Sequence, residues 1–239
     1  MQPLIECKNI GFSVSPDKFI FVNTNLLINA GDFVVVLGGN GSGKSTLIKL
    51  INQTYQATTG DILLKQKSIR DYSAVQMRQE IVTLTQSIND SLFLDLTVEE
   101  NALLIETMNA TPTRQSLPEY LATFHQKLAT HLKTRVKQLS GGEQQILAFA
   151  LYLRHKPDLL LLDEHTSALD PKKSDAVMQF TDEFIRKEKL TCLMTTHELK
   201  YALQYGNRLI ALRDGQIVFD VRDEEKKSLT MMDLLEHCY

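Results

Sequence analysis

The chain has 239 residues, of which 43% are apolar and 23% charged, and its net charge is −3. This length corresponds to one large domain or to a core with an inserted lobe, because a domain usually has about 100–200 residues. The slight acidic excess argues against nucleic acid as a partner, since binding to a phosphate backbone needs clustered positive charge. A membrane-spanning helix needs about 20 apolar residues, and no apolar run in the sequence is nearly that long.

The N-terminus and the cysteines exclude two further classes of protein. The first ten residues, MQPLIECKNI, have no basic start followed by a long apolar stretch, so we expect no secretory signal. Cys7, Cys192 and Cys238 are far apart, which fits neither a disulfide framework nor the spacing of metal ligands. We therefore expect reduced thiols that pack as small apolar side chains.

The N-terminal part of the chain is expected to be rich in strands. Residues 4–37 alternate between apolar and polar side chains, and the run from Phe33 to Leu37 is continuously apolar. Such a run is typical of a strand that is buried on both faces of a parallel sheet. Apolar residues at helical spacing then predict a helix from Lys44 to about Asn52.

The middle of the chain, from about residue 91 to residue 153, is expected to be mostly helical. Thr97 and Glu100 have the spacing of a capping box, which predicts a helix that begins at Val98. The polar stretch TPTRQSLP at 111–118 predicts a loop between two helices.

Further strands are predicted in the last third of the chain. The apolar runs at 159–162 and 190–196 predict two buried strands, and an Asp-Gly turn at 214–215 between two apolar runs predicts a hairpin. Because buried strands alternate with helices, the sequence predicts an α/β fold.

A glycine-rich sequence joins the predicted strand at 33–37 to the helix that follows. It consists of Gly38, Gly39, Asn40, Gly41, Ser42, Gly43, Lys44, Ser45 and Thr46. This is the phosphate-binding loop of nucleotide-binding proteins, in which glycines let backbone N–H groups converge on phosphate oxygens at a helix N-terminus. In that motif the lysine reaches the β- and γ-phosphates and the serine hydroxyl binds Mg²⁺. The loop alone does not separate kinases, GTPases and motors.

Two acidic residues, Asp163 and Glu164, follow the predicted strand at 159–162. The carboxyl ends of parallel strands are where such sheets bind their ligands. We expect Asp163 to hold Mg²⁺, which takes oxygen ligands and keeps several waters. Glu164 is expected to polarise a water in line with the γ-phosphate.

Four more motifs make the sequence resemble the ATP-binding-cassette (ABC) ATPases. Leu139–Glu143 (LSGGE) resembles the signature of that family, Gln86 the Q-loop glutamine, Ser167–Asp170 the D-loop and His197 the switch histidine. The resemblance covers residues 4–220. It implies a P-loop NTPase (RecA-like) core with an antiparallel β lobe and a helical lobe. All of these would form a single domain of residues 1–239, with the helical lobe at about 91–153, between the Q-loop and Asp163.

The resemblance also assigns roles to individual residues. Glu164 would be the general base or water-orienting group, His197 would bond the γ-phosphate, and Gln86 would contact Mg²⁺ and the attacking water. The signature would contact ATP that is held by a partner subunit, so that ATP joins two copies into a homodimer. The signature residues concerned are Ser140, Gly141, Gly142 and Glu143.

Three positions differ from the commonest family pattern. Glu143 stands where glutamine is more common, and His165 stands where many members have proline. The sequence DEHTSALDP around His165 resembles a bacterial subgroup of importer ATPases. Val14 falls where an aromatic ring usually stacks on adenine, which leaves three other rings as alternatives: Phe12, Phe19 and Phe21.

The resemblance implies an ATPase that uses ATP and Mg²⁺ to power a membrane transporter, with import of a small solute, such as an amino acid, as the expected task. Its partners would be transmembrane permease subunits and, indirectly, a solute-binding protein. It would lie in the cytoplasm, peripheral on the inner face of the cell membrane. One alternative is a soluble ABC ATPase of a scaffold, as in iron–sulfur cluster assembly. Another is a regulatory ATP binder without turnover, against which Glu164 and His197 weigh.

Overall fold

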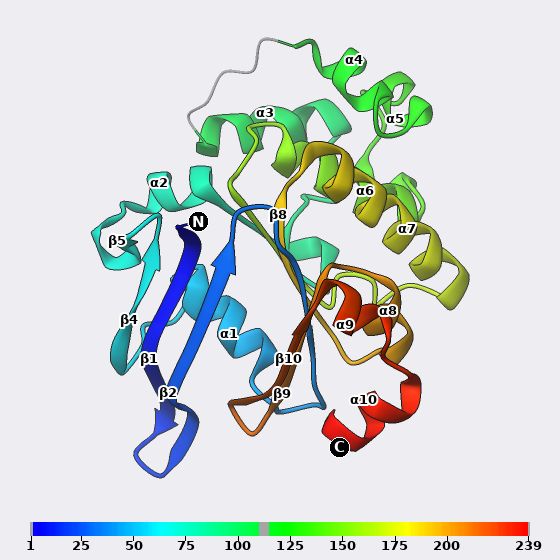
Figure 1. Cartoon of the computed structure of the whole chain (residues 1–239). Helices are drawn as coiled ribbons and strands as arrows, with labels where there is room; N and C mark the ends of the chain where they lie inside the picture. Colours follow the sequence, from blue (N-terminus) through cyan, green and yellow to red (C-terminus); the bar gives the residue numbers. More distant parts are fainter. Residues whose placement is uncertain (1, 110–114, 239) are drawn as a thin grey trace.

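The structure, a computed structural model, describes residues 2–109 and 115–238 and shows the predicted α/β fold (Figure 1). Its first sheet is antiparallel, with the strand order β2-β1-β4-β5. The long hairpin of the first two strands forms most of this sheet. Its strands are β1 (Pro3–Ser15), β2 (Lys18–Asn29), β4 (Thr59–Leu64) and β5 (Lys67–Ser68).

The second sheet has six strands in the order β10-β9-β3-β8-β7-β6. All neighbouring strands in it are parallel except the β9–β10 hairpin, which the Asp-Gly turn predicted. Its strands are β3 (Phe33–Leu37), β6 (Ile81–Leu84), β7 (Leu159–Asp163), β8 (Thr191–Thr196), β9 (Arg208–Arg213) and β10 (Gln216–Arg222).

The second sheet is buried on both faces, which explains its continuously apolar strands. In β3, Val34 and Val36 belong to an apolar cluster that also holds residues of α1 (Lys44–Ile51) and the first sheet. Phe33, Val35 and Leu37 belong to a second cluster, which the helices on the opposite face complete. Helix α1 is therefore packed between the two sheets, with the N-terminus at the end of β3 (Figure 1).

Most of the remaining helices cover the other face and one end of the sheet (Figure 1), whereas Met77 of α2 (Ala74–Glu80) belongs to the apolar cluster of α1 and the first sheet. Helices α3 to α6 fall within the segment that was predicted to be mostly helical. The helices are α2 (Ala74–Glu80), α3 (Val98–Asn109), α4 (Leu117–Ala122), α5 (Gln126–Thr130), α6 (Gly141–Leu153), α7 (Pro171–Glu188), α8 (Leu199–Gln204), α9 (Asp223–Lys227) and α10 (Met231–Cys238), with 3-10 turns at Ile69–Asp71, Ile88–Asp90 and Val136–Gln138.

The predicted start of α3 is confirmed, whereas the predicted loop at 111–118 is too long. The Thr97 amide and hydroxyl donate to the Glu100 carboxylate, and the Glu100 amide donates back to the Thr97 hydroxyl. Helix α4 already begins at Leu117 and holds Pro118 in its first turn, where the missing N–H of proline has no intrahelical acceptor to lose. The other part of the loop, residues 110–114, lies outside the described residues.

Two of the three cysteines are buried thiols, as predicted. Cys7 and Cys192 are 2% and 0% exposed and carry no disulfide. Burial raises the pKa of the Cys7 thiol to about 12, because the charged thiolate is poorly solvated there. The side chain of Cys238 lies outside the described part of the chain.

Candidate functional site

Four loops meet at one edge of the six-stranded sheet, because the parallel strands β3, β8, β7 and β6 lie side by side and end there. The phosphate-loop sequence follows β3, and Gln86 follows β6. Asp163 is the last residue of β7, and His197 follows β8. The strand order thus brings to one edge residues that are far apart in the sequence.

The phosphate-loop sequence folds around the ammonium group of Lys44. Gly41 and Gly43 have φ angles of 82° and 107°, in the left-handed region that favours glycine. Lys44 is 5% exposed, and its ammonium donates to the carbonyl oxygens of Gly38 and Gly39 at 2.8 and 3.2 Å. No side chain caps the N-terminus of α1. Its first backbone N–H groups can therefore bind an anion.

A hollow of about 360 Å³ lies beside this loop, within the range of small-molecule sites. Of the predicted loop residues, Gly38, Gly39 and Ser42 do not line it. A Cβ on Gly38 would lie 2.4 Å from the carbonyl oxygen of Leu212, so glycine is required there. The hollow is lined by Lys18, Ile20, Asn40, Gly41, Gly43, Lys44, Ser45, Thr46, Gln86, Asp163 and Glu164.

Ser45 and Asp163 place two oxygen ligands next to each other in the hollow. The Ser45 hydroxyl donates to Asp163 Oδ1 at 3.0 Å. Hydroxyl and carboxylate oxygens suit Mg²⁺, which commonly takes one or two such protein groups and completes its shell with phosphate and water. Gln86 lines the same hollow and offers an amide oxygen. These residues fit a Mg²⁺ ion that arrives with a phosphate ligand.

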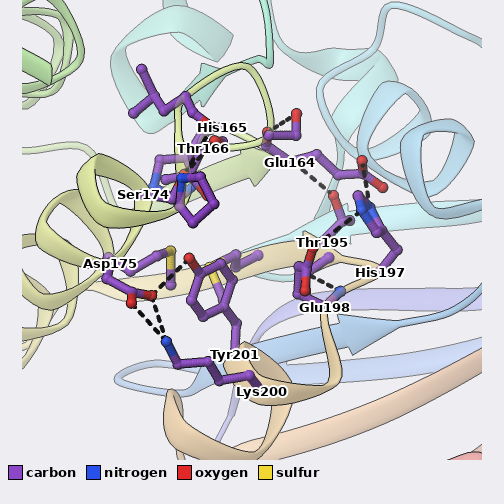
Figure 2. Close-up of a pocket in the computed structure, with 16 residues that line it drawn as sticks. Glu164, His165, Thr166, Ser174, Asp175, Thr195, His197, Glu198, Lys200 and Tyr201 are labelled. Carbon is purple, nitrogen blue, oxygen red and sulfur yellow. Dashed lines mark hydrogen bonds and ion pairs between the residues drawn. The ribbon is translucent and has the colours of Figure 1, made fainter. Parts of the chain in front are cut away.

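Glu164 joins Lys44 to His197. Its Oε1 lies 3.2 Å from Lys44 Nζ. Its Oε2 lies 3.0 Å from His197 Nδ1 (Figure 2). Its backbone has a φ of 47°, which is unfavourable for a residue with a Cβ and marks a specific requirement at this position. The two neighbouring acids thus have different surroundings: Asp163 accepts from hydroxyls, whereas Glu164 contacts an ammonium group and an imidazole.

The structure does not bring the signature to this hollow. Ser140 is the N-cap of α6, its hydroxyl accepts from the Glu143 amide, and Glu143 Oε2 accepts from the Ser140 amide at 2.8 Å. None of the residues 140–143 is among those that line the hollow. The signature and the phosphate loop therefore do not line a common hollow within this chain.

Contacts within its own chain explain why glutamate suits position 143. Besides the Ser140 amide it contacts the Lys127 ammonium at 2.6 Å. Lys127 and the backbone donor together lower the pKa of the Glu143 carboxyl to about 2. Glutamate at this position therefore closes a capping box and holds an ion pair, which a neutral glutamine would not do as well.

None of the four residues considered for the adenine contact lines the hollow. Val14 and Phe19 are 66% and 63% exposed, and Phe21 is buried in the core. Phe12 stacks on Tyr55, with the ring centroids 5.2 Å apart and the planes at 9°. The hairpin residues that do line the hollow are Lys18 and Ile20, which the sequence reasoning missed.

The surroundings of two other residues near Glu164 were not foreseen. Thr195, on β8, hydrogen-bonds both acids. The only signal in the sequence was its position two residues before His197, because the pairing of its strand with the one that carries Asp163 appears only in the fold. His165 is 2% exposed, and burial lowers its pKa to about 4, so it is neutral at neutral pH.

Comparison with known proteins gives consistent relatives. A sequence profile of the family described as ABC transporter matches residues 21–167. The tyrosine transport ATP-binding protein of Clostridioides difficile is 37% identical over 98% of this chain and 98% of its own length. The phosphonates import ATP-binding protein PhnC of Lactobacillus delbrueckii subsp. bulgaricus is 33% identical over 94% of this chain and 91% of its own.

Solved structures show the same fold. The structure of cbiO1 from Clostridium perfringens, part of the ABC transporter complex cbiONQ, superposes with a TM-score of 0.81 at 23% identity, covering 94% of this chain and 90% of that one. An ATP-binding cassette of an ABC transporter in its ADP conformation gives a TM-score of 0.80 at 23% identity, with 99% and 96% coverage. In the described residues, no helix is long and apolar enough to cross a membrane.

Proposed function

The chain belongs to the ABC transporter family, whose ATP-binding members are ATPases coupled to transport, and we propose that it is the ATP-hydrolysing subunit of a bacterial importer for a small organic solute. The observation that carries the proposal is the meeting of Lys44, Asp163, Glu164 and His197 at one sheet edge. These four side chains come from three separate segments of the chain, and each has a use in phosphoryl transfer to water.

The chemistry follows from what each group can do. Lys44 and the uncapped N-terminus of α1 bind the phosphates of ATP. Ser45, Asp163 and Gln86 would hold Mg²⁺, which neutralises charge on the transferring phosphoryl group. Glu164 orients a water and accepts its proton. His197, held by Glu164 at 3.0 Å, donates to the γ-phosphate as charge develops.

A second copy of the chain completes the site in this proposal. The signature lies apart from the hollow of its own chain, yet it opens a 13-residue helix with a serine and two glycines. A helix start of this kind can bind an anion. We infer that it faces ATP bound by the other subunit, so that ATP joins a symmetric dimer and hydrolysis separates it.

A groove between α2 and α3 offers a docking place for a permease subunit. It has a volume of about 370 Å³, and Met77, Ile105 and Met108 are among its apolar lining residues. Next to it α3 leaves Leu103 and Met108 64% and 50% exposed. Exposed apolar side chains beside a groove favour a protein partner, and the groove suits an amphipathic helix of a permease. This contact would hold the chain at the cytoplasmic face of the membrane.

Two relatives support an importer of a small organic solute. One is named for tyrosine transport and the other for phosphonate import. In such an assembly a solute-binding protein and the permease select the solute, and this chain supplies the motor. An amino acid is the class that we propose. The relatives offer no support for a scaffold of iron–sulfur cluster assembly.

The test of the motor is turnover by the wild type and by Glu164→Gln. The variant keeps the shape and most hydrogen bonds but loses the base, so ATP binding should persist while hydrolysis falls by about 10²–10⁴-fold. Glu183→Gln on α7, whose carboxylate accepts from the Gln179 side chain and does not line the hollow, is the control and should keep full activity. Wild-type turnover in Glu164→Gln would show that Glu164 is not the base.

The test of the partner is co-purification from detergent-solubilised membranes. A protein with many membrane spans should accompany the chain, and Met108→Glu in the groove should release it while leaving ATP hydrolysis by the isolated subunit intact. Recovery of a partner without membrane spans instead would contradict the transporter assignment.

A further inference from the structure

Thr195 is a buried threonine at the end of β8 whose hydroxyl contacts both acidic residues of the site. The side chain is 1% exposed, and Thr195 is the register partner of Asp163 in the parallel pair β7–β8. Its Oγ1 lies 2.7 Å from Asp163 Oδ1 and 3.2 Å from the backbone nitrogen of Glu164. Figure 2 shows Thr195 between the loops that carry Glu164 and His197.

The direction of these hydrogen bonds is fixed by chemistry. A hydroxyl has one proton to donate and lone pairs that accept. The backbone N–H of Glu164 can only donate, so Thr195 accepts from it. The proton of Thr195 then goes to Asp163 Oδ1, which is closer than the carbonyl oxygen of Leu162 at 3.4 Å. The Thr195 hydroxyl thus links the carboxylate of Asp163 to the backbone of Glu164 through two hydrogen bonds.

Both acids depend on such support. Asp163 Oδ1 accepts from Thr195 on one side and from Ser45 on the other, which fixes the orientation of the carboxylate. Glu164 has a left-handed backbone with a φ of 47°, a conformation that persists only where its surroundings hold it. Its N–H is held by Thr195, and its carbonyl oxygen is held by the amide and hydroxyl of Ser167.

We propose that Thr195 is a positioning residue for ATP hydrolysis, which fixes the metal-binding carboxylate of Asp163 relative to the water-orienting carboxylate of Glu164. This inference rests on the proposed ATPase function. Thr195 is not among the residues that line the hollow beside the phosphate loop. It acts through the two acids, as hydrogen-bond partners behind metal ligands do.

The experiment compares three variants on strand β8. Thr195→Val keeps the shape and removes the hydroxyl, and Thr195→Ser keeps the hydroxyl. Thr191→Val is the matched control, because Thr191 is also a buried threonine of β8 and accepts from the Gly31 amide, away from the site. Should Thr195→Val not fold, Thr195→Ala removes the same hydroxyl with a smaller side chain.

Two readouts separate positioning from general packing. The first is ATP turnover as a function of ATP and of Mg²⁺. Thr195→Val should lower kcat by about 10- to 100-fold and raise the Mg²⁺ concentration for half-maximal rate, while KM for ATP changes little. The second is the affinity of Mn²⁺ for the ATP-loaded protein, measured by electron paramagnetic resonance, which should fall by about tenfold or more. Thr195→Ser and Thr191→Val should resemble the wild type in both.

The outcomes are distinct. Unchanged kcat and Mn²⁺ affinity in Thr195→Val would overturn the inference, and so would an equal loss in Thr191→Val, which would indicate a packing effect along the strand. Failure of Thr195→Ser to retain activity would also overturn it, because the hydroxyl would not be the group that matters. A wild type without ATP turnover would overturn the proposed function itself, and this inference with it.

Discussion

The helices α1 and α6 both begin in glycine-rich sequences, yet their N-termini are built differently. Helix α1 follows Gly43, has no side-chain cap and opens onto the hollow that holds Lys44. Helix α6 follows Ser140 and is closed by a reciprocal capping box with Glu143. The first N-terminus is open to an anion from within its own chain, whereas the capping box of the second occupies the amides of Ser140 and Glu143 and leaves those of Gly141 and Gly142 without a cap among the described residues.

One glycine of each helix start, Gly43 and Gly142, shows a similar difference. Gly43 has a φ of 107°, and a Cβ there would lie 3.1 and 3.3 Å from the side chains of Phe21 and Ile20. Gly142 has no atom of the described residues within 4 Å of such a Cβ. The chain itself therefore requires glycine at position 43 but leaves room for a side chain at position 142, whereas a Cβ on the neighbouring Gly141 would lie 3.1 Å from Leu169. This difference is what a site shared between two subunits predicts.

Gly43→Ala should disrupt the phosphate loop, and we expect it to have the largest effect. A Cβ in this conformation is strained and meets two side chains, so we expect a loss of about 1–3 kcal/mol in the free energy of unfolding, together with weaker ATP binding. Gly31→Ala is the control, because Gly31 also has a positive φ but nothing within 4 Å. Urea unfolding and ATP titration measure both effects. Equal losses in the two variants would show that crowding at Gly43 adds nothing.

Val14→Tyr tests the contact with the adenine base on the phosphate-loop side. An aromatic ring on a base contributes about 1–3 kcal/mol, so a tyrosine that reaches adenine should tighten ATP binding by about that amount. Because Phe12 is stacked on Tyr55, Phe12→Ala should leave ATP affinity nearly unchanged, and ATP and GTP should bind the wild type within about tenfold of each other. Titrations with fluorescent ATP and GTP analogues measure these affinities. A loss above about 1 kcal/mol in Phe12→Ala would identify Phe12 as the stacking ring.

Glu143→Gln should open the cap on the signature side. It weakens the bonds to the Ser140 amide and to Lys127, and we expect a loss of about 1 kcal/mol in the free energy of unfolding at pH 7. The pKa of Glu143 is lowered from 4.5 to about 2 in the folded chain. Its stabilisation is therefore complete above pH 4.5 and is lost as the pH falls toward 2. Urea unfolding at pH 7 and pH 3 should show the difference between wild type and variant shrinking in acid. A constant difference would exclude this carboxylate as its source.

Gly142→Ala should have the smallest effect on the isolated chain. Alanine in a helix is about 0.5–1 kcal/mol more favourable than glycine, and nothing in the chain obstructs the new methyl group, so thermal unfolding should show a slight gain in stability. ATP affinity of the monomer should not change, whereas turnover should fall because the partner's nucleotide must approach here. Full turnover with Gly142→Ala would show that close approach at this position is not required.

Much of the fold was predictable because its signals are local. The apolar run at 33–37, the capping box of Thr97 and Glu100, and the Asp-Gly turn each lie within a few residues, and each specifies one element. The start of α4 is not predictable from its proline alone, because Pro118 is compatible both with a loop and with the first turn of a helix.

The site was predictable residue by residue but not in its contacts. Lys44, Asp163, Glu164 and His197 were each predicted from motifs, whereas their connections depend on which strands are neighbours. The role of Thr195 arises from its register with Asp163, and the place of Lys18 in the hollow arises from the course of the β1–β2 hairpin over the phosphate loop. Sheet order and register are set by packing across the whole chain, which a single motif does not encode.

The most direct test of a site shared between two chains is the molar mass of Glu164→Gln with ATP, measured by size-exclusion chromatography with light scattering, with and without Ser140→Arg. Glu164→Gln should bind ATP without hydrolysing it and double its mass when ATP is added. The added arginine should block the surface that meets the partner's γ-phosphate, so the double variant should bind ATP with the same affinity and remain a monomer. Loss of ATP binding by the double variant would place Ser140 in the site of its own chain, and persistent dimerisation would place the signature outside the interface; either result would contradict the account.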